Sequence, residues 1–348
     1  MTMPGKHTYQ EIISQPQAWT QALEVVQSQK GEITQFWNEH PKIRVLFTGC
    51  GSTYYLSLAA ASLFQELTGR GPRAVPGGEL ILYPETAYEV DMPTLLVAIS
   101  RSGTTTETVA AAQKFKQMDR GPILVITNYE NTPLAKLGDI TFTIPAGQEK
   151  SVAQTRSFAS MYVAATAFAA ISAGRSGLLA SMEKLPSLGE KLIQEYDGLA
   201  CSIGENLDLD RFYFLGSGPR YGLACETNLK MKEMTLTHSE PFHFFEFRHG
   251  PMSMVTSSTA VIGMRSSVNS NHEQTVLDEM RNLGGQILSL GESDADIAFE
   301  SHLPEEVRNV LYLPTLQLMA FYRAKAKGLD PDNPRNLSAV VHLDVEKI

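Results

Sequence analysis

Residues 43–53, IRVLFTGCGST, decide the fold that this chain is expected to adopt. The apolar run Ile43–Phe47 ends in a glycine-rich polar turn, and apolar residues then recur at helical spacing from Tyr54 to Leu67. This order of strand, glycine turn and helix is typical of the first unit of an α/β sheet. The apolar run TLLVAI at 94–99 is likewise followed by a polar turn, with a helix expected from about Glu107.

Other apolar runs extend the expected sheet. Residues 122–127 and 140–144 predict two more strands, and residues 79–83 are a candidate for another. Continuous apolar runs of this length fit strands that are buried on both faces of a parallel sheet. Because they alternate with helical patterns, the chain is predicted to have an α/β fold with a doubly wound, mostly parallel sheet flanked by helices.

The chain then repeats this pattern. The segment FYFLGSG at 212–218 predicts a second strand and glycine turn, placed so that Gly218 follows Gly51 by 167 residues. A length of 348 residues also suggests about two domains. We therefore expect two copies of one α/β unit. The expected parts are an N-terminal helical segment over 1–40, a first domain over 41–195, and a second domain with a C-terminal tail over 196–348.

Composition excludes several classes of protein. The chain has 29 Lys and Arg against 38 Asp and Glu, a formal net charge of −9, and no basic run stands out, so no nucleic-acid partner is expected. Cys50, Cys201 and Cys225 form neither a disulfide framework nor a CxxC pair, and the N-terminus has no apolar signal core. These features predict a cytoplasmic protein. No HxxxH pattern or Cys/His cluster indicates a metal, and no cofactor is expected.

One uncharged stretch raises the question of a membrane span. Residues 157–174 carry no charge, but they are mostly alanine and serine. A lone span is expected to be rich in large apolar residues and about 20 residues long. The stretch is therefore predicted to be a buried, close-packed helix, and no membrane association is expected.

Hydroxyl-bearing residues and glycines gather in the turns after the first two strongly apolar runs. The carboxyl ends of parallel strands meet at one edge of a sheet, so the two turns are expected to meet there. Each turn precedes a helix, whose free N–H groups and positive dipole end favour an anion, and a phosphate site is predicted. The alternative is that these residues only cap helices. The candidate donors are Gly51, Ser52, Thr53, Ser100, Ser102 and Thr105.

The two turns also exclude familiar nucleotide sites. They match neither the P-loop pattern GxxxxGKS/T nor the dinucleotide pattern GxGxxG, which argues against nucleotide hydrolysis and against NAD. In the second copy the corresponding stretch, Ser267–Ser270, has no glycine and fewer hydroxyls. The second copy is therefore predicted to have lost the anion-binding role.

Candidate acid–base groups lie in the second copy. Glu226, Lys230 and Glu233 share one face of an expected helix, although a solvated ion-paired face would have the same spacing. Further on, His249 lies in a phenylalanine-rich turn before Gly250 and Pro251, which indicates a fixed position. A carboxylate and a histidine in one site can divide acid–base work, whereas a lone histidine is more often structural.

These motifs together resemble the tandem sugar-isomerase (SIS) domain family, and within it the isomerase half of glucosamine-6-phosphate synthase and related aminosugar-phosphate deaminases and isomerases. The CGST run at 50–53 is similar to the family's CGTS loop, and ISRSGTT at 99–105 to its ISQSGET loop, with Arg101 in place of Gln. In the family both loops hold the sugar 6-phosphate. The resemblance therefore implies a phosphate site made by Cys50, Gly51, Ser52, Thr53, Ser100, Arg101, Ser102, Gly103 and Thr105.

Three further segments carry the resemblance. Residues 147–153 resemble a sugar-contacting segment, which implies that Val152 and Ala153 contact substrate. Residues 230–233, KMKE, resemble KLKE, which implies that Lys230 lies at the substrate and that Glu233 moves a proton between C1 and C2. Residues 248–251, RHGP, resemble KHGP, whose histidine assists ring opening from a neighbouring subunit. His249 and a homodimer with a shared active site are expected on this ground.

Two departures from the family are visible. The family synthase carries an N-terminal glutaminase domain, whereas this chain starts about where the isomerase half starts, so glutamine hydrolysis is not expected. The family motif PRNLAK also ends in a lysine that forms a Schiff base with the open sugar. Here Ala339 takes that position, and Lys347 is an uncertain substitute. The resemblance then implies either a route without a lysine imine or a changed activity.

The resulting prediction is an enzyme, an aminosugar-6-phosphate deaminase/isomerase. It would convert an amino-hexose 6-phosphate such as glucosamine 6-phosphate into a ketose 6-phosphate and ammonia. Two alternatives remain: a ketose/aldose isomerase or fructosamine-6-phosphate deglycase, and a non-catalytic sugar-phosphate sensor. Ala339 favours the sensor slightly, while the presence of both Glu233 and His249 argues against it.

Overall fold

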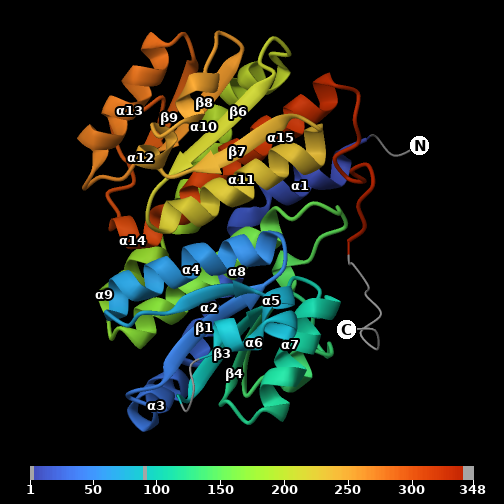
Figure 1. Ribbon diagram of the computed structural model, residues 1–348, viewed down its shortest axis with the longest axis vertical. Helices are drawn as coiled ribbons and strands as arrows, with labels where there is room; N and C mark the ends of the chain where they lie inside the picture. The colour runs from blue at the N-terminus through green and yellow to red at the C-terminus, as the bar shows by residue number, and fades with distance from the viewer. Residues whose placement is uncertain (1–3, 89–91, 340–348) are drawn as a thin grey trace. The chain divides into compact units, whose positions relative to one another are not determined.

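The computed structural model describes residues 4–88 and 92–339 of the chain (Figure 1). They form two compact units, each containing one five-stranded parallel sheet. The β1–β5 unit comprises Gln17–Glu149, Arg156–Glu183 and the described part of Ser338–Ile348. The β6–β10 unit comprises the described part of Met1–Pro16, Lys150–Thr155 and Lys184–Leu337.

The sheet of the β1–β5 unit has the strand order β2-β1-β3-β4-β5, and every neighbouring pair is parallel. Its central strand β3, TLLVAI, is buried along its whole length, as expected for a strand covered on both faces. The strands are β1 (Arg44–Gly49), β2 (Arg73–Pro76), β3 (Thr94–Ile99), β4 (Ile123–Thr127) and β5 (Ile140–Thr143).

The sheet of the β6–β10 unit repeats this topology. Its order is β10-β9-β8-β6-β7, and all pairs are again parallel. Numbered within its own unit, each sheet therefore reads 2-1-3-4-5. The strands are β6 (Arg211–Gly216), β7 (His238–Phe242), β8 (Thr259–Met264), β9 (Gln286–Gly291) and β10 (Ile297–Ala298).

The repeat predicted from the sequence is confirmed in backbone geometry. Helices α4 (Ser52–Thr68) and α11 (Pro219–Thr235), which follow β1 and β6, are both 17 residues long. Gly51 precedes α4 with φ +55° and ψ −124°, and Gly218 precedes α11 with φ +59° and ψ −135°. The residue that follows each helix also adopts the left-handed conformation, but it is Gly69 after α4 and Leu236 after α11.

Helices cover both faces of the first sheet (Figure 1). On one face Phe47 of β1 packs against Phe64 of α4, which stacks on Phe168 of α8. On the other face Leu96 and Phe115 belong to a core between the sheet and α5 and α7. The helices are α2 (Gln15–Ser28, most of it in this unit), α3 (Lys30–Glu39), α4, α5 (Gly77–Leu82), α6 (Pro84–Ala87), α7 (Thr106–Gln117), α8 (Arg156–Ser172) and α9 (Ser176–Met182), with 3-10 turns η1 (Ala135–Leu137) and η2 (Pro145–Gly147).

The second sheet is also covered on both faces. Helices α10, α11 and α15 pack together on one face, and α12 and α13 enclose a core with Tyr213 and Val261 on the other (Figure 1). The N-terminal helix α1 belongs to this unit, because Asp332 accepts hydrogen bonds from the backbone of His7 and Thr8. The helices are α1 (Lys6–Ile13), α10 (Leu185–Glu205), α11, α12 (Phe244–Phe247), α13 (Ser270–Asn282), α14 (Glu305–Arg308) and α15 (Leu313–Ala326), with 3-10 turns η3 (Pro251–Met254) and η4 (Asn309–Tyr312).

Two local expectations can be compared with the structure. The strand considered at 79–83 is wrong: these residues lie largely in α5, and the strand is β2 at Arg73–Pro76. The reason is amphipathic burial, since Leu80 is fully buried while Leu82 is largely exposed, which does not suit a strand buried on both faces. The buried helix expected at 157–174 is confirmed as α8. Within the described part of the chain, no helix is both long and apolar enough to span a bilayer.

Candidate active site

The turn after β1 is held by its own threonine. The Thr53 hydroxyl accepts a hydrogen bond from the backbone N–H of Cys50 (2.9 Å) and donates one to the Cys50 carbonyl (3.0 Å). Gly51 adopts a positive φ, and a Cβ added there would meet no neighbour within 4 Å, so glycine serves the backbone angle rather than close packing. Ser52 and Thr53 are buried at the first turn of α4. The turn therefore presents a fixed helix start.

The turn after β3 is held by a second set of hydroxyls. The Ser100 hydroxyl lies 3.1 Å from that of Thr105 and accepts the backbone N–H of Gly103 (3.1 Å). The Ser102 hydroxyl accepts from both the backbone and the side chain of Thr104. A Cβ at Gly103 would lie 2.1 Å from the Thr132 hydroxyl, and φ there is +63°, so only glycine fits.

These two turns meet at the point where the sheet changes winding direction. β1 and β3 are hydrogen-bonded neighbours, but the chain leaves β1 toward one edge of the sheet and β3 toward the other. In open α/β sheets this junction is where ligands bind. Cys50 and Thr108, one from each side of the junction, are in contact at 3.4 Å. The starts of α4 and α7 therefore converge, and their N–H groups and dipoles favour an anion.

The Cys50 thiol is not suited to act as an acid, a base or a nucleophile near neutral pH. Burial raises the pKa of its thiol above the ordinary value, only partly offset by the hydrogen bond with Thr108. A thiol with a raised pKa stays protonated near neutral pH, and the thiolate is the nucleophilic form. Cys50 can therefore contribute shape and a weak donor to the site, but not a nucleophile.

Arg101 does not stand as an isolated cation at the predicted phosphate site. It is 7% exposed, lies 3.5 Å from the Glu149 carboxylate and donates to the Ala339 carbonyl (3.0 Å). Glu149 in turn accepts from the backbone N–H of Ser157 (3.0 Å). A buried arginine needs such a partner, and this need could have singled out Glu149 within the segment 147–153.

Val152 and Ala153 belong to the β6–β10 unit. The backbone N–H of Val152 donates to the Asp332 carbonyl (3.0 Å), and the Ala153 carbonyl accepts from the Ser151 hydroxyl (3.0 Å). The adjoining segment is tied to α1, because Glu11 accepts the backbone N–H of Lys150 (2.6 Å). Their assignment as substrate contacts stays a prediction.

The charged face of α11 is buried rather than solvated. Glu226 is fully buried and Lys230 is 1% exposed, so the alternative of a solvated ion-paired face does not hold. The Lys230 ammonium lies 3.4 Å from a Glu226 carboxylate oxygen and also donates to Glu233. Glu233 is the more open carboxylate of the two and lines a cavity of about 240 Å³ together with Asn333 and Arg335.

This arrangement suits a carboxylate that exchanges protons with a ligand. Lys230 contacts both carboxylates, so one ammonium group lies between Glu226 and Glu233 and fixes the orientation of Glu233. Glu233 keeps access to a cavity while its neighbours hold it in place. A positioned carboxylate at a cavity is the geometry required of a general acid or base.

His249 lies elsewhere in the same unit. Its backbone N–H donates to the Glu246 carbonyl (3.0 Å), and its side chain is exposed. The turn is anchored by Phe247 in the core and by Arg248, which donates twice to Glu279 (2.6 and 2.7 Å). The residue is positioned, as expected from its surroundings in the sequence.

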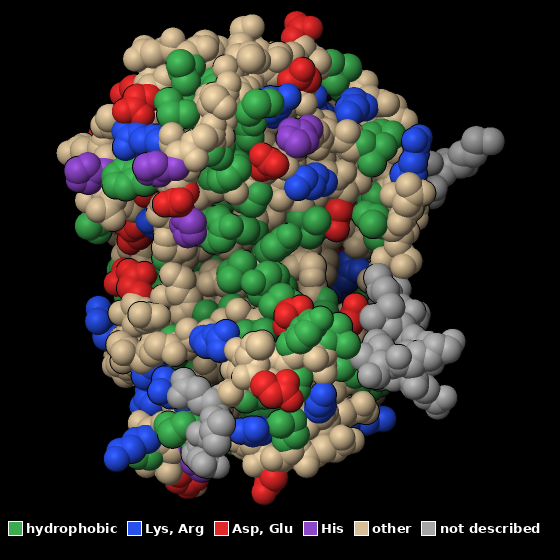
Figure 2. Space-filling view, viewed as in Figure 1, with side chains coloured by type: hydrophobic (Ala, Val, Ile, Leu, Met, Phe, Trp, Pro, Cys, Tyr) green, Lys and Arg blue, Asp and Glu red, His purple; other side chains and the backbone are tan. Residues whose placement is uncertain are grey.

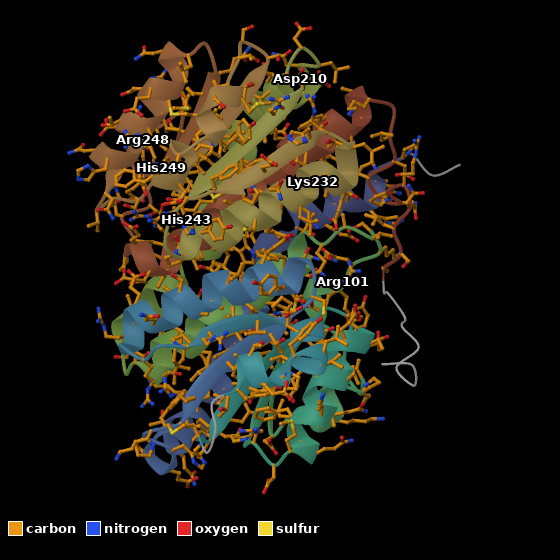
Figure 3. All side chains as sticks on the ribbon, viewed as in Figure 1. Arg101, Asp210, Lys232, His243, Arg248 and His249 are labelled. Atoms are coloured by element: carbon orange, nitrogen blue, oxygen red, sulfur yellow. The ribbon has the colours of Figure 1, made fainter. Side chains whose placement is uncertain are left out.

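Glu233 and His249 are at opposite edges of the second sheet. β6 and β7 are parallel, so α11 carries the chain back from the carboxyl edge to the amino edge, and Glu233 lies at the far end of this helix. His249 follows the carboxyl end of β7. Figure 3 shows this separation between His249 and Lys232, the neighbour of Glu233. At 1.5 Å per residue, the start of α11 and Glu233 are about 21 Å apart.

The carboxyl edge of the second sheet differs from that of the first. After β8, the backbone N–H groups of Ser266 and Ser267 donate to Glu273 (2.5 Å) and Glu305 (2.7 Å). Arg220, in the first turn of α11, pairs with the same two carboxylates. Side chains of the chain itself therefore occupy the donors that an anion would use, which explains why an anion site is not expected here.

No motif in the sequence pointed to Glu273 and Glu305. Glu273 is four residues inside α13, and Glu305 arrives from α14, beyond the end of the repeated strands. Among the described residues, no group of three or more His, Cys, Asp or Glu side chains is arranged to hold a metal ion.

The fold and the site define the class: a duplicated α/β protein with hydroxyl-rich turns at the switch point of one copy and a buried ion-paired cluster in the other. The SIS domain family model matches residues 39–171 and 208–322, one stretch for each sheet. The chain belongs to the SIS domain family. The resemblance inferred from the sequence and the predicted fold class of two tandem SIS domains are both confirmed.

Relatives within the family are enzymes of sugar-phosphate chemistry. Glutamine–fructose-6-phosphate aminotransferase (isomerizing) of Sulfurisphaera tokodaii is 31% identical over 308 residues, 86% of this chain and 50% of that protein. The Methanothermobacter thermautotrophicus protein of the same name is 27% identical over 94% of this chain and 54% of its own length. The chain thus spans about half the length of these relatives. Their similarity supports the prediction that this chain is an enzyme.

Solved structures give two further likenesses. A glucosamine-6-phosphate deaminase from Thermotoga maritima is 28% identical, with a TM-score of 0.75, over 93% of this chain and 100% of that one. A tagatose-6-phosphate ketose/aldose isomerase from Escherichia coli has a TM-score of 0.85 over 98% of this chain and 99% of that one. At 22% identity, the second likeness shows the fold alone.

Proposed function

We propose that this chain is an aminosugar-6-phosphate deaminase/isomerase, which converts an amino-hexose 6-phosphate into a ketose 6-phosphate and ammonia. The observation that carries the proposal is the buried set Glu226, Lys230 and Glu233, in which a carboxylate at a cavity is held by an ammonium group. The likeness to a glucosamine-6-phosphate deaminase, which this chain matches along that protein's whole length, supports the same activity.

Binding is assigned to the turns after β1 and β3. Ser100, Ser102, Thr105 and the turn at 50–53 would hold the 6-phosphate with hydroxyls and helix N–H groups. A phosphate far from the reacting carbons supplies binding energy that can be used to orient C1 and C2. Arg101, paired with Glu149, would shape the turn after β3 rather than meet the phosphate as a free charge.

Glu233 is assigned the proton transfer. In the open-chain amino aldehyde, Glu233 takes the proton from C2, the electron pair forms the C1–C2 double bond, and the aldehyde oxygen takes a proton from solvent, which gives an enol with the amino group retained. Protonation at C1 then gives a C2 iminium, which water hydrolyses to the ketone with release of ammonia. Lys230, which donates to Glu233, would hold its carboxylate in place and lie near the substrate oxygen at C1.

This route needs no lysine imine, because the substrate's own nitrogen forms the imine. That chemistry agrees with alanine at position 339, where the family motif has lysine. Lys347, considered as a substitute, lies outside the described residues. In the opposite reaction, amination of a ketose phosphate, the substrate carries no nitrogen from which it could form this imine.

His249 is assigned ring opening, contributed by a second copy of the chain. The support is its distance from Glu233 within one unit, which follows from their places at opposite edges of the second sheet. A homodimer that shares its active sites would supply His249 to the partner's sugar. Mixing Glu233→Gln chains with His249→Ala chains should then restore part of the activity that each variant lacks alone.

The activity is tested by ammonia release from glucosamine 6-phosphate, galactosamine 6-phosphate and a fructosamine 6-phosphate. The proposal expects release from an amino-hexose 6-phosphate with formation of a ketose 6-phosphate. Ketose–aldose exchange without ammonia would overturn the deaminase and favour a simple isomerase. Release from the fructosamine alone would favour a deglycase, and binding without turnover of any of them a sensor.

A further inference from the structure

A cavity of about 470 Å³ opens at the carboxyl edge of the second sheet, between the turns after β6 and β8. Ser217 lines it from the first turn and Asn269 from the second. Because β6 and β8 are neighbours whose connections run to opposite edges of the sheet, this is the switch point of the second copy, where open α/β sheets bind ligands. Small-molecule pockets have volumes of roughly 300–1,000 Å³.

The charges around this cavity disfavour an anion. Glu273 and Glu305 already accept the backbone N–H groups of Ser266 and Ser267, and both pair with Arg220. Glu246 adds an exposed carboxylate to the wall. Among the described residues that line the cavity, none is lysine or arginine. A phosphate here would meet negative charge and find the nearby donors engaged.

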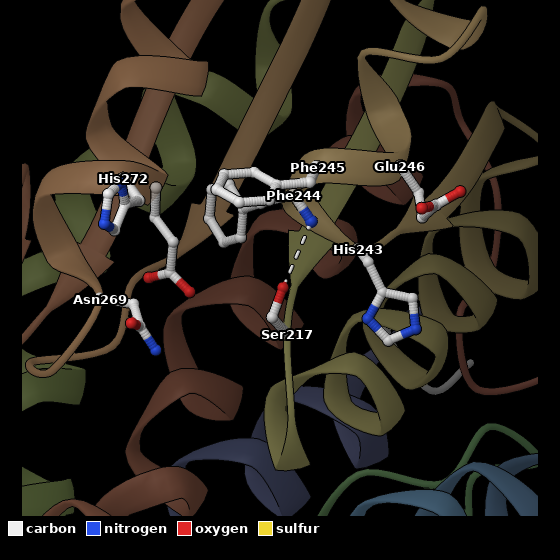
Figure 4. Close-up of a pocket in the computed structure, with 8 residues that line it drawn as sticks. Ser217, His243, Phe244, Phe245, Glu246, Asn269 and His272 are labelled. Carbon is white, nitrogen blue, oxygen red and sulfur yellow. Dashed lines mark hydrogen bonds between the residues drawn. The ribbon is translucent and has the colours of Figure 1, made fainter.

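The walls combine an apolar platform with planar polar groups (Figure 4). The ring of Phe245 is 51% exposed, meets the ring of His272 edge-on at 6.2 Å, and has the Arg248 guanidinium over one face at 5.2 Å, which leaves the opposite face for a ligand. The backbone N–H of Asn269 donates to the Ser266 hydroxyl (2.7 Å), and its side-chain amide has no hydrogen-bond partner among the described residues. The Ser217 hydroxyl accepts the backbone N–H of Phe244 (3.3 Å). Figure 2 shows histidine and hydrophobic side chains close together over α12 and α13.

His243 adds a neutral imidazole. Its ring stacks on Tyr221 with centroids 3.9 Å apart, and burial lowers its pKa from the ordinary value. A neutral imidazole donates through one nitrogen and accepts through the other. The cavity therefore offers amide, hydroxyl, imidazole and carboxylate groups beside a phenyl face, which matches a ring with hydroxyls at its edge and C–H groups on its face.

We propose that this cavity is a second ligand site that binds an unphosphorylated sugar, with preference for an amino sugar whose ammonium group pairs with Glu246. The site goes beyond the proposed function, because it uses neither the turns after β1 and β3 nor Glu233. It would allow the protein to sense the dephosphorylated form of the sugar that its other copy binds as a phosphate.

The test is calorimetric titration of the full chain with glucosamine, glucose and inorganic phosphate as separate probes. The expected result is saturable binding of glucosamine, weaker binding of glucose, and no phosphate binding that depends on this cavity. Phe245→Ala and Asn269→Leu should each weaken glucosamine binding roughly tenfold. Glu246→Gln should weaken glucosamine binding and leave glucose binding unchanged.

Two control variants separate this site from the first. Val268→Ser changes an 84% exposed neighbour of Asn269 that does not line the cavity, and Ser102→Ala changes the first switch point. Both should keep wild-type affinity for glucosamine, and circular dichroism should show all variants folded. The proposal is overturned if wild type does not bind glucosamine, or if Ser102→Ala weakens binding while Phe245→Ala does not. A failed ammonia assay leaves this result untouched, because binding is measured directly.

Discussion

The two switch points of this molecule share the glycine turn before α4 and α11 but differ in the groups that line the turns after β3 and β8. After β3, hydroxyls of Ser100 and Ser102 line the turn, and Glu149 is engaged by Arg101 and Ser157. After β8, the Glu305 carboxylate pairs with Arg220 of α11 and accepts the backbone N–H of Ser267. In each copy the carboxylate follows the last strand by only a few residues. In the second copy an internal carboxylate therefore accepts a backbone N–H group that a bound anion would otherwise use.

The largest effect is expected at Glu233, because the proposal assigns proton transfer to the second copy and phosphate binding to the first. Glu233→Gln should lower the rate of ammonia release about 10³-fold, because the amide cannot exchange the substrate proton. Binding of glucosamine 6-phosphate should survive, since the phosphate turns are in the other unit. Glu195→Gln on α10, an exposed glutamate paired with Lys191, is the matched control and should leave the rate unchanged. A Glu233→Gln enzyme with a near-normal rate would remove Glu233 from the mechanism.

Glu305 tests whether its carboxylate occupies an anion position at the second switch point. Glu305→Ala should lower the free energy of unfolding by about 3 kcal/mol, because Arg220 and the Ser267 N–H lose a buried partner. Inorganic phosphate should then raise the Tm of the variant more than that of wild type, since the anion replaces the carboxylate. Glu306→Ala, in the same helix, is the control. Equal phosphate shifts in variant and wild type would contradict the comparison.

The first switch point depends on the shape of its turn. Gly103→Ala should lower the free energy of unfolding by about 2 kcal/mol, because a side chain meets Thr132 and φ is positive. It should also weaken glucosamine 6-phosphate binding. Gly51→Ala, with positive φ but open space, should cost less, and Gly71→Ala, with neither feature, should be neutral. Equal denaturant midpoints for all three variants would exclude the steric account.

The smallest effect is expected at a single hydroxyl. Ser102→Ala should weaken glucosamine 6-phosphate binding about tenfold, the size of one hydrogen bond to a charged group, while kcat changes little. Ser267→Ala in the second copy, whose backbone rather than hydroxyl meets Glu305, should leave this affinity unaltered. Unchanged affinity and rate in Ser102→Ala would place the phosphate elsewhere.

Features set by neighbouring residues were predictable from the sequence, whereas contacts between residues far apart along the chain were not. The strand–turn–helix units were predictable because apolar runs and Gly51 and Gly218 are local signals. The strand at Arg73–Pro76 was missed because it is short and only one of its residues is buried. Glu149 and Glu305 were missed for another reason: each acts on a turn more than 35 residues away along the chain, and no spacing rule connects them.

Leu236 ends α11 in the left-handed conformation that Gly69 adopts at the end of α4. A leucine with positive φ stores roughly 1–2 kcal/mol of backbone strain that glycine avoids. Local opening of the last turn of α11 releases that strain, so amide hydrogens there should exchange with solvent sooner than those at the end of α4. The same turn carries Glu233, so the exchange rate of these amides would report on the mobility of the candidate proton carrier.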